Sequence, residues 1–206
     1  MPTGVAACAT GWRVERSGAT VFLFSPTLRA VEPANWRSIL VDALRAMPRS
    51  GAVVAKRVRA DGAVASMGTF VVHPKGHHEL GAGGPAEAFR FPEECDAFSG
   101  GVAAIDAEAF ASIDGASAIN LPLGPLELSM RLRAADLRVV ALPAVVATDD
   151  GELATDGPSR VAFCERWGFD WRAADLAAVR RRHAGTGLLW NVRLHGSTLP
   201  YEKYAR

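Results

Sequence analysis

The feature that most constrains the fold is an amphipathic helix between two short apolar strands. The run "GATVFLFSP" (Gly18–Pro26) is apolar, β-branched and bounded by turn residues, which is typical of a buried strand. In the following "EPANWRSILVDALRAMP", apolar residues recur at helical spacing between two prolines: Trp36, Ile39, Leu40, Ala43, Leu44 and Met47. The run "GAVVAKRV" (Gly51–Val58) then predicts a second strand. Strands that alternate with helices indicate an α/β fold with a mixed sheet.

The same alternation continues along the chain. Asp61-Gly62 predicts a tight turn into a third strand that runs through "GTFVVH", so we expect a hairpin. Residues 73–95 are rich in Gly, Pro and polar residues, and predict a long surface loop. Val102–Ile105 predicts a strand, and Asp106 an N-cap for the helix "AEAFASI". Near the C-terminus we expect a strand in "LRVVALPAVVAT" and helices in residues 160–167 and in "AADLAAVRRRHAG".

The stretch "LPLGPLELSMRLRAADLRVVALP" carries two conflicting signals. Four apolar residues alternate with polar ones, which is the pattern of a half-buried strand: Leu126, Leu128, Met130 and Leu132. Yet residues 125–137 include no β-branched residue and are mostly helix formers. Pro125 suits a first helical turn, and Glu127 and Arg131 form a favourable i,i+4 pair. We predict a helix that has Leu128, Leu132 and Ala135 on one face, and treat the alternation as coincidence.

Length, composition and charge exclude several classes of protein. The 206 residues suit one domain, and 49% apolar with 22% charged residues is a globular composition. A formal net charge of +1 offers no electrostatic basis for nucleic-acid binding. No apolar run approaches the ~18 residues of a membrane span, and residues 1–18 lack the pattern of a signal peptide. We therefore expect a cytoplasmic protein, with peripheral attachment to a membrane as the alternative.

The three cysteines are far apart in the sequence. Cys8, Cys95 and Cys164 form no metal-type CxxC pair and no even-numbered disulfide framework. Free cysteines fit a reducing compartment, and we expect each to be a buried structural residue.

The order of these segments resembles that of family-2 glycosyltransferases with the GT-A fold. The resemblance covers roughly residues 4–150 and rests on "VFLFSP", "ADGAVASMG", "SGGVAAIDAEAF" and "LELSMRLRAADLRVVALPAVV". It implies transfer of a sugar from a nucleotide donor to a hydroxyl acceptor, usually in cell-surface glycan or natural-product assembly. It also implies a truncated GT-A-like domain in residues 1–150 that lacks the N-terminal nucleotide-binding part. Residues 151–206 would then be a helical extension packed on that domain.

On the donor side, the resemblance implies a metal site that this chain lacks. The family's acidic motif would bind Mg²⁺ or Mn²⁺ and bridge it to the nucleotide-sugar diphosphate. Ser25, Pro26 and Thr27 stand at that position, with no carboxylate among them. Where the family often has a further histidine ligand, the chain has Ala147, Thr148 and Asp149. We expect no cofactor for this chain alone, and Mg²⁺ or Mn²⁺ with a nucleotide sugar if it is active.

On the acceptor side, the resemblance implies a turn and a general base. The turn is Ser99-Gly100-Gly101, where glycine permits close backbone approach; a plain turn leading into a strand is the alternative. The family's acidic pair falls on Gly124-Pro125, which leaves Glu127 as the candidate catalytic carboxylate. His77 and His78 are candidates for acceptor binding.

Other polar groups have both functional and plain structural interpretations. Together with His73, the two loop histidines would suit Zn, Cu or Ni, or would belong to a solvated loop. The acidic residues Glu93, Glu94 and Asp96 form either an acid/base pair or a solvated turn. The run Arg180–His183 is either a helix end or an anionic-membrane patch. Trp167, Trp171 and Trp190 belong to the core, to an interface or to a sugar-stacking platform, and Gly185–Gly187 is too short for a phosphate loop.

Three hypotheses follow from the sequence. The first is a glycosyltransferase-family protein that is inactive by itself. The second is a non-catalytic interaction module, in which a homodimer or a partner subunit covers an exposed sheet edge. The third is a small-molecule or carbohydrate binder that uses the former acceptor cleft and the histidine-rich loop.

Overall fold

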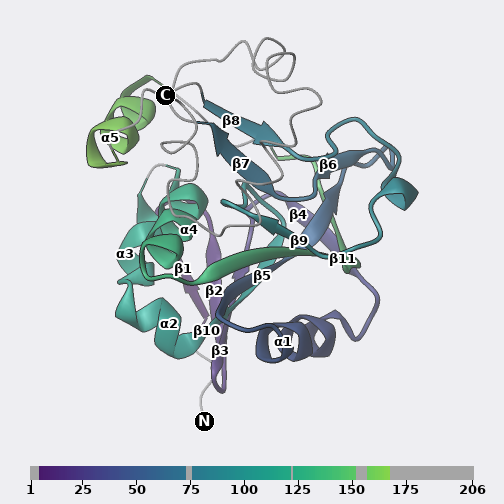
Figure 1. Cartoon of the computed structure of the whole chain (residues 1–206), viewed down its shortest axis with the longest axis horizontal. Coiled ribbons are helices and arrows are strands. Elements are labelled where there is room, and N and C mark those ends of the chain that lie inside the picture. The colour runs from purple at the N-terminus through teal and green to yellow at the C-terminus, as the bar shows by residue number, and fades with distance from the viewer. Residues whose placement is uncertain (1–4, 73–75, 122, 152–156, 168–206) are drawn as a thin grey trace.

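A computed structural model describes residues 5–72, 76–121, 123–151 and 157–167. Those residues form an α/β fold with a mixed sheet flanked by helices (Figure 1). The main sheet has nine strands: β1 (Val5–Ala7), β2 (Arg13–Ser17), β3 (Thr20–Phe24), β4 (Leu28–Glu32), β5 (Ser50–Val58), β6 (Val64–Ser66), β9 (Glu93–Cys95), β10 (Val102–Asp106) and β11 (Arg138–Asp149). A separate two-stranded sheet contains β7 (Thr69–Val72) and β8 (Gly76–Glu79). The helices are α1 (Trp36–Ala46), α2 (Ala107–Ser112), α3 (Gly115–Asn120), α4 (Gly124–Ala134) and α5 (Gly157–Trp167), with a 3₁₀ turn η1 (Ala86–Ala88).

Because of their directions, three strands have their carboxyl ends on the same side of the molecule. The strand order is β1-β2-β3-β10-β5-β11-β4, with β6 paired to β5 and β9 paired to β11. β10 is antiparallel to both β3 and β5, while β5 and β11 are parallel. β3, β5 and β11 therefore run in the same direction, and β10 begins where they end. We call this side of the molecule the carboxyl edge.

Alternate residues of the central strands β3, β5 and β10 enter cores on opposite faces of the sheet. Leu23 and Val54 pack in a core with α2, α3 and α4. Phe22 and Val53 pack in a second core, which α1 covers. A strand with both faces buried reads as a continuous apolar run rather than an alternating one, which explains "VFLF" and "AVVA" in the sequence.

Most of the regular elements predicted from the sequence are confirmed. The strands at β3, β5, β10 and β11 and the helices at α1, α2, α4 and α5 all form. Asp106 caps α2 as predicted, because its carboxylate accepts hydrogen bonds from the backbone N–H groups of Glu108 and Ala109. The predicted hairpin after Asp61-Gly62 also forms, between β5 and β6.

Two expectations about the loops are wrong. Residues 73–95 are not one long loop, because β8, η1 and β9 lie within them. β9 and β8 depend on pairing with β11 and β7, which local composition does not reveal. The third strand is also divided into β6 and β7, because Gly68 lies between them at a φ of +101° that strand residues do not adopt.

β2, which the sequence did not predict, pairs with β3 on the side away from β10. β3 therefore has a neighbouring strand on each side. Among the described residues, the outermost strands of the main sheet are β1 and β4. In the described part of the chain, β6 and β9 lie off that order and each pair with one strand only, so a partner that covers a sheet edge would meet β1, β4, β6 or β9.

The alternating segment is the helix α4, and both of its apolar stripes are buried. At 3.6 residues per turn, residues two apart lie about 200° apart, so period-2 alternation produces two opposite stripes. Leu128 and Leu132 pack in the core against the sheet. Leu126 and Met130 pack on the other side of the helix, with Phe163 of α5. The alternation is thus not a coincidence, as the sequence interpretation has it, but the pattern of a helix held between two cores.

Leu128→Ala tests the burial of α4. The side chain is fully buried, so truncation should lower the free energy of unfolding by about 2–5 kcal/mol. The exposed Ala134 at the end of the same helix provides the control, since Ala134→Ser should change it by less than about 0.5 kcal/mol. Urea unfolding followed by circular dichroism measures both. Equal effects of the two substitutions would contradict the placement of α4.

Candidate functional site

The carboxyl edge gathers polar side chains from four separate parts of the chain. Ser25 and Thr27 follow β3, Arg57 lies near the end of β5, Ser99 precedes β10, and Asp149 ends β11. We call these five residues the carboxyl-edge cluster. The Ser25–Thr27 and Ser99–Gly101 turns are separate candidates in the sequence, and in the structure both reach one carboxylate, that of Asp149, through Thr27 and Gly101.

Asp149 is fully buried and is the centre of this cluster. Its Oδ1 accepts a hydrogen bond from Thr27 Oγ1 at 2.5 Å and from the Gly151 N–H at 2.9 Å. Its Oδ2 accepts one from the Gly101 N–H at 2.6 Å. Burial pushes the pKa of Asp149 upward, but the hydrogen bonds from Thr27, Gly151, Gly101 and Ser25 outweigh it and hold the pKa below its usual value.

Arg57 is the cation of the cluster and is only 6% exposed. It donates from Nη1 to Ser99 Oγ at 3.0 Å and from Nη2 to the Gly151 carbonyl at 2.9 Å, while its buried Nε has no hydrogen-bond partner. Gly100 lies against both charges, because a Cβ there would be 2.3 Å from Arg57 Nη1 and 3.0 Å from Asp149 Oδ2. The glycine therefore permits a close approach, made here to side chains of the chain itself.

The cluster does not fit the divalent cation that the resemblance implies. Mg²⁺ and Mn²⁺ need several oxygen ligands with free lone pairs. Asp149 is the one carboxylate of the cluster, two backbone N–H groups point at it, and Arg57 supplies a cation close by. Among the described residues, no three His, Cys, Asp or Glu side chains gather as metal ligands would.

Glu127, the candidate base, is fully buried and forms a separate set of contacts. Its carboxylate pairs with Arg131 Nε at 3.2 Å, which confirms the predicted i,i+4 pair. It also accepts hydrogen bonds from Arg166 Nη1 at 2.9 Å and from Trp167 Nε1 at 2.8 Å. Since Arg166 and Trp167 belong to α5, this carboxylate fastens α5 to α4.

The opposite polar side of α4 holds the segment that leads to Ser99. Ser129 Oγ accepts a hydrogen bond from the Phe98 N–H at 3.4 Å. Arg133 donates to the Cys95 carbonyl at 3.2 Å. The turn before β10 is thereby fixed to α4 as well as to the carboxyl-edge cluster.

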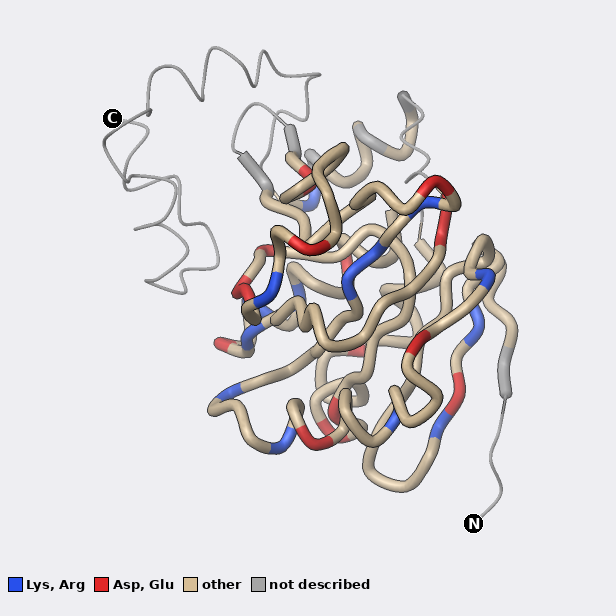
Figure 2. Tube along the Cα trace, turned by 90° about the vertical axis from the view of Figure 1, so that its right-hand side faces the viewer, with Lys and Arg blue, Asp and Glu red and all other residues tan. Residues whose placement is uncertain are grey.

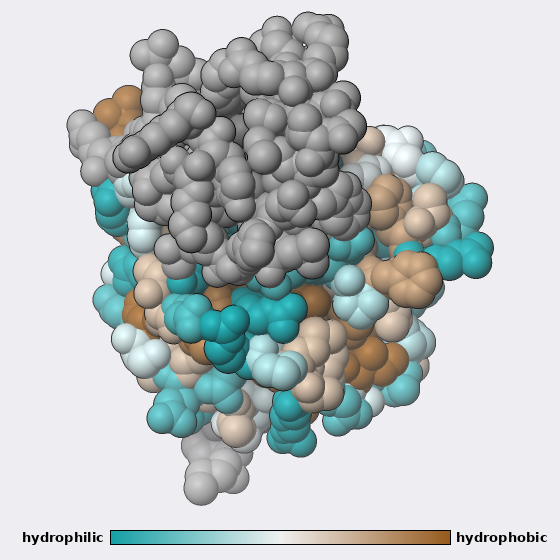
Figure 3. All heavy atoms as spheres, in the orientation of Figure 1, coloured by the Kyte–Doolittle hydropathy of each residue, from teal (hydrophilic) through white to brown (hydrophobic). Residues whose placement is uncertain are grey.

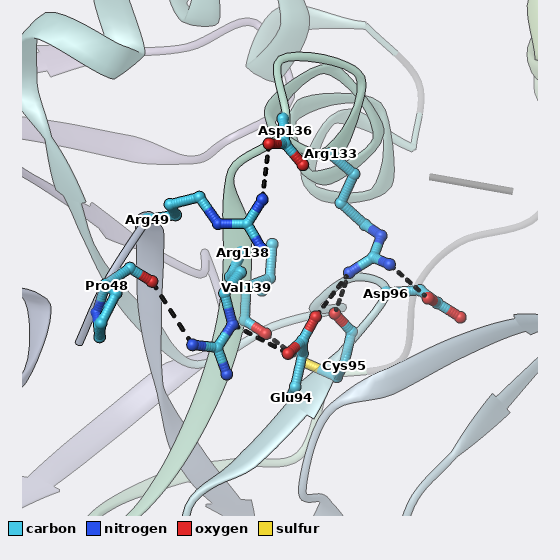
Figure 4. Close-up of polar contacts among 9 residues, drawn as sticks. All are labelled: Pro48, Arg49, Glu94, Cys95, Asp96, Arg133, Asp136, Arg138 and Val139. Atoms are coloured by element: carbon cyan, nitrogen blue, oxygen red, sulfur yellow. Dashed lines mark hydrogen bonds and ion pairs between the residues drawn. The ribbon is translucent and has the colours of Figure 1, made fainter. Parts of the chain in front are cut away.

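Two of the acidic residues before this turn, Glu94 and Asp96, form ion pairs with arginines instead of an acid/base pair or a solvated turn. The buried Arg133 lies between Glu94 and Asp96, with N–O distances of 3.6 and 3.5 Å (Figure 4). Arg138 pairs with the other oxygen of Glu94 at 2.9 Å. Glu94 and Asp96 therefore each face an arginine. The sequence offered no signal of this, because Arg133 lies 37 residues beyond Asp96 and 39 beyond Glu94.

The loop histidines lie on the β7–β8 hairpin. His77 and His78 belong to β8, where His78 is opposite Phe70. An isolated bridge between Thr69 and Ala97 links this hairpin to the segment before Ser99. The carboxylate of Glu79, at the end of β8, accepts hydrogen bonds from the hydroxyls of Ser66 and Thr69.

Several predictions fall outside the described residues: His73, Trp171, Trp190, Arg180–His183, Gly185–Gly187 and the helix expected at 173–185. Trp167 is described, and it packs beside Phe163 in addition to its hydrogen bond to Glu127.

Of the cysteines, Cys95 is buried in the core and Cys8 is half-buried against it, and both are free thiols. Burial raises the pKa of the Cys8 thiol.

Charge and helix length add two general observations. Figure 2 shows acidic and basic residues interspersed along the described part of the trace, in keeping with the formal net charge of +1. Within the described ranges, every helix falls short of the length and apolarity needed to cross a bilayer.

Compared with known protein families and with curated proteins, the chain matches none of them.

Sequence reasoning missed Arg57 and the central role of Asp149. A signal for Arg57 exists, because two cations, Lys56 and Arg57, interrupt an otherwise apolar strand at its carboxyl end. Asp149 was noted only for standing where a histidine is common. Its role depends on partners as far as 122 residues away, which spacing does not reveal.

Asp149→Asn should weaken the fold at neutral pH and remove part of its acid sensitivity. Because the folded-state pKa is depressed, the carboxylate contributes stability above the unfolded pKa of about 3.9, which is lost as pH falls through the folded value. We expect a loss of about 1–3 kcal/mol at pH 7, since an amide nitrogen cannot accept the hydrogen bonds. Urea unfolding should show that the difference in unfolding free energy between wild type and Asp149→Asn is smaller near pH 3 than at pH 7.

The exposed Asp42 on α1 provides the control, since Asp42→Asn should change the unfolding free energy by less than about 0.5 kcal/mol at either pH. A difference between wild type and Asp149→Asn that is the same at both pH values would argue against the assigned hydrogen bonds.

Glu127→Ala should release α5 from α4. The substitution leaves Arg166 and Trp167 without their acceptor and should cost about 1–3 kcal/mol. Hydrogen exchange followed by mass spectrometry should show faster exchange in residues 157–167 while β5 stays protected. Glu127→Gln keeps one acceptor oxygen and should have a smaller effect, and the exposed Glu108→Ala should have none. Unchanged exchange in residues 157–167 of Glu127→Ala would refute the contact.

Proposed function

We propose that the chain is a glycosyltransferase-like domain that binds a hydroxyl-bearing ligand at the carboxyl edge of its sheet and does not transfer a sugar by itself. The order of segments described above and the mixed sheet flanked by helices support the GT-A-like part of this proposal. The binding part is supported by the general preference of α/β folds for ligands at the carboxyl ends of their strands.

The observation that carries the proposal is that Glu127 and Asp149, the two carboxylates best placed to act as a general base, are buried and already hydrogen-bonded. A general base must reach the acceptor hydroxyl with a free lone pair. Glu127 is sealed from solvent and already accepts from Arg131, Arg166 and Trp167. Asp149 is equally buried, and backbone N–H groups and the Thr27 hydroxyl occupy its oxygens. Both acids are used to hold the fold together.

The donor side leads to the same proposal. Departure of a nucleoside diphosphate needs a metal or a cationic clamp, since charge stabilisation at the leaving group is usually the largest catalytic contribution. Ser25 and Thr27 provide hydroxyls only, and Arg57 is committed to Ser99 and Gly151. Without such a clamp, the described residues favour binding over transfer.

The outer side of the carboxyl edge is suited to a ligand. Pro26 and Thr27 are exposed, while Ser25 and Ser99 lie buried behind them. Hydroxyls and the backbone groups of the Ser99–Gly101 turn are the kinds of partner that a carbohydrate or another polyhydroxylated molecule uses.

Ligand titrations with and without Mn²⁺ test the proposal. UDP-, GDP- and dTDP-sugars with Mn²⁺ should leave the melting temperature unchanged, because a ligand raises it only where a site exists. Mono- and oligosaccharides added without metal should shift the amide signals of Ser25, Thr27 and residues 99–101 and 149–151 in ¹⁵N spectra. As a control, residues 36–46 of α1 should not shift. A rise in melting temperature that requires Mn²⁺ and is lost in Asp149→Asn would overturn the proposal.

A further inference from the structure

One edge of β11 has a gap between two strands that pair with it. β9 pairs with β11 at residues 139–141, and β4 pairs with it at residues 146–149. Residues 142–145 lie between these two ladders, and the register with β5 also shifts there. Ala144 in this interval is exposed. The described residues thus leave a break in the sheet edge next to β4.

A shallow, mostly apolar groove of about 630 Å³ lies at the β4 end of this gap. Its lining residues come from the end of β4, the turn that follows and the interrupted part of β11: Val31, Glu32, Pro33, Ala34, Ala144 and Val146. Glu32 is the one charged residue of the lining. It is exposed and has no ion-pair partner among the described residues.

An exposed phenylalanine approaches the same gap from its other end. Phe91 is 78% exposed and lies two residues before β9. Because β9 is antiparallel to β11 and Glu93 is opposite Ala141, the residues before β9 continue toward residue 142 of β11. The one other large hydrophobic residue that is exposed in the described part of the chain is Val161, at 56%. Figure 3 shows hydrophobic side chains on the right-hand flank of the molecule, the side on which η1 lies in Figure 1.

A buried lysine holds the loop that carries Phe91 through two hydrogen bonds. Lys56 is 7% exposed and donates from Nζ to the carbonyls of Ala86 at 3.0 Å and Phe89 at 3.4 Å. Arg90 donates from Nε to the Glu87 carbonyl at 2.7 Å and has no ion-pair partner among the described residues. An aromatic residue beside an arginine on a fixed loop is the composition of a binding hot spot.

We propose that this surface is a self-association interface, in which Phe91 of one copy enters the groove of a second copy and Arg90 faces Glu32 there. The protrusion and the groove flank the same gap, so a two-fold axis through the gap would form both contacts twice. The unpaired positive charge beside the protrusion and the unpaired negative charge of the groove are complementary. A second copy is therefore the occupant that the chain's own features specify.

Sedimentation velocity over a range of concentrations tests the association. Wild type should show a concentration-dependent dimer. Phe91→Ser should weaken it about thirty-fold or more, as expected for a central aromatic anchor. Val161→Ser is the matched control, because it removes the other exposed hydrophobic side chain and should leave the dimer unchanged. A strictly monomeric wild type, or equal association of wild type and Phe91→Ser, would overturn the proposal.

A charge swap tests the pairing itself. Arg90→Glu and Glu32→Arg should each weaken the dimer, roughly two- to fivefold for each of the two symmetry-related pairs. The double variant should restore association toward the wild-type level, because the opposite charges face each other again. Both side chains are on the surface, and circular dichroism confirms that each variant folds. Failure of the double variant to recover would show that Arg90 does not face Glu32.

Discussion

The packing of α4 between two hydrophobic cores is the constraint on which the rest of the structure depends. One apolar stripe rests against the sheet and the other against α5, so no broad face of the helix meets solvent. The polar residues between the stripes fasten different segments. Glu127 and Arg131 reach α5 and the turn after α2, and Ser129 and Arg133 reach the segment before β10. Each of these four sides has its own partner, and the one contacted by Ser129 and Arg133 leads directly into the Ser99–Gly101 turn of the candidate site.

The sequence predicts those parts of the fold whose signal is local. The strands β3, β5, β10 and β11 and the helix α1 are recognisable because their own residues carry the apolar pattern. β2, β8 and β9 are polar or glycine-containing and owe their form to pairing with distant strands, so composition does not reveal them. The helix α4 was identified from residue types, while the meaning of its alternation required knowing that both sides are covered.

The candidate site shows the same limit. The two turns, Ser25–Thr27 and Ser99–Gly101, were identified separately, one from a missing motif and the other from its glycines. Their meeting at Asp149 depends on the order of strands in the sheet, which no short motif encodes. Glu127 was identified as a lone carboxylate, but its partners Arg166 and Trp167 lie about forty residues further along the chain. A carboxylate conspicuous in a sequence is thus as compatible with joining distant segments as with chemistry.

Lys56 and Arg57 are consecutive in β5, and consecutive residues of a strand point to opposite faces of a sheet. Lys56 fastens the loop that carries Phe91, and Arg57 fastens the turns of the carboxyl edge. One peptide unit therefore anchors both surfaces. Any displacement of this end of β5 would move the two anchors together, so that ordering one surface would restrict the motion of the other. Were a ligand on one surface to couple to a partner on the other through this peptide unit, each would change the affinity of the other by the same factor.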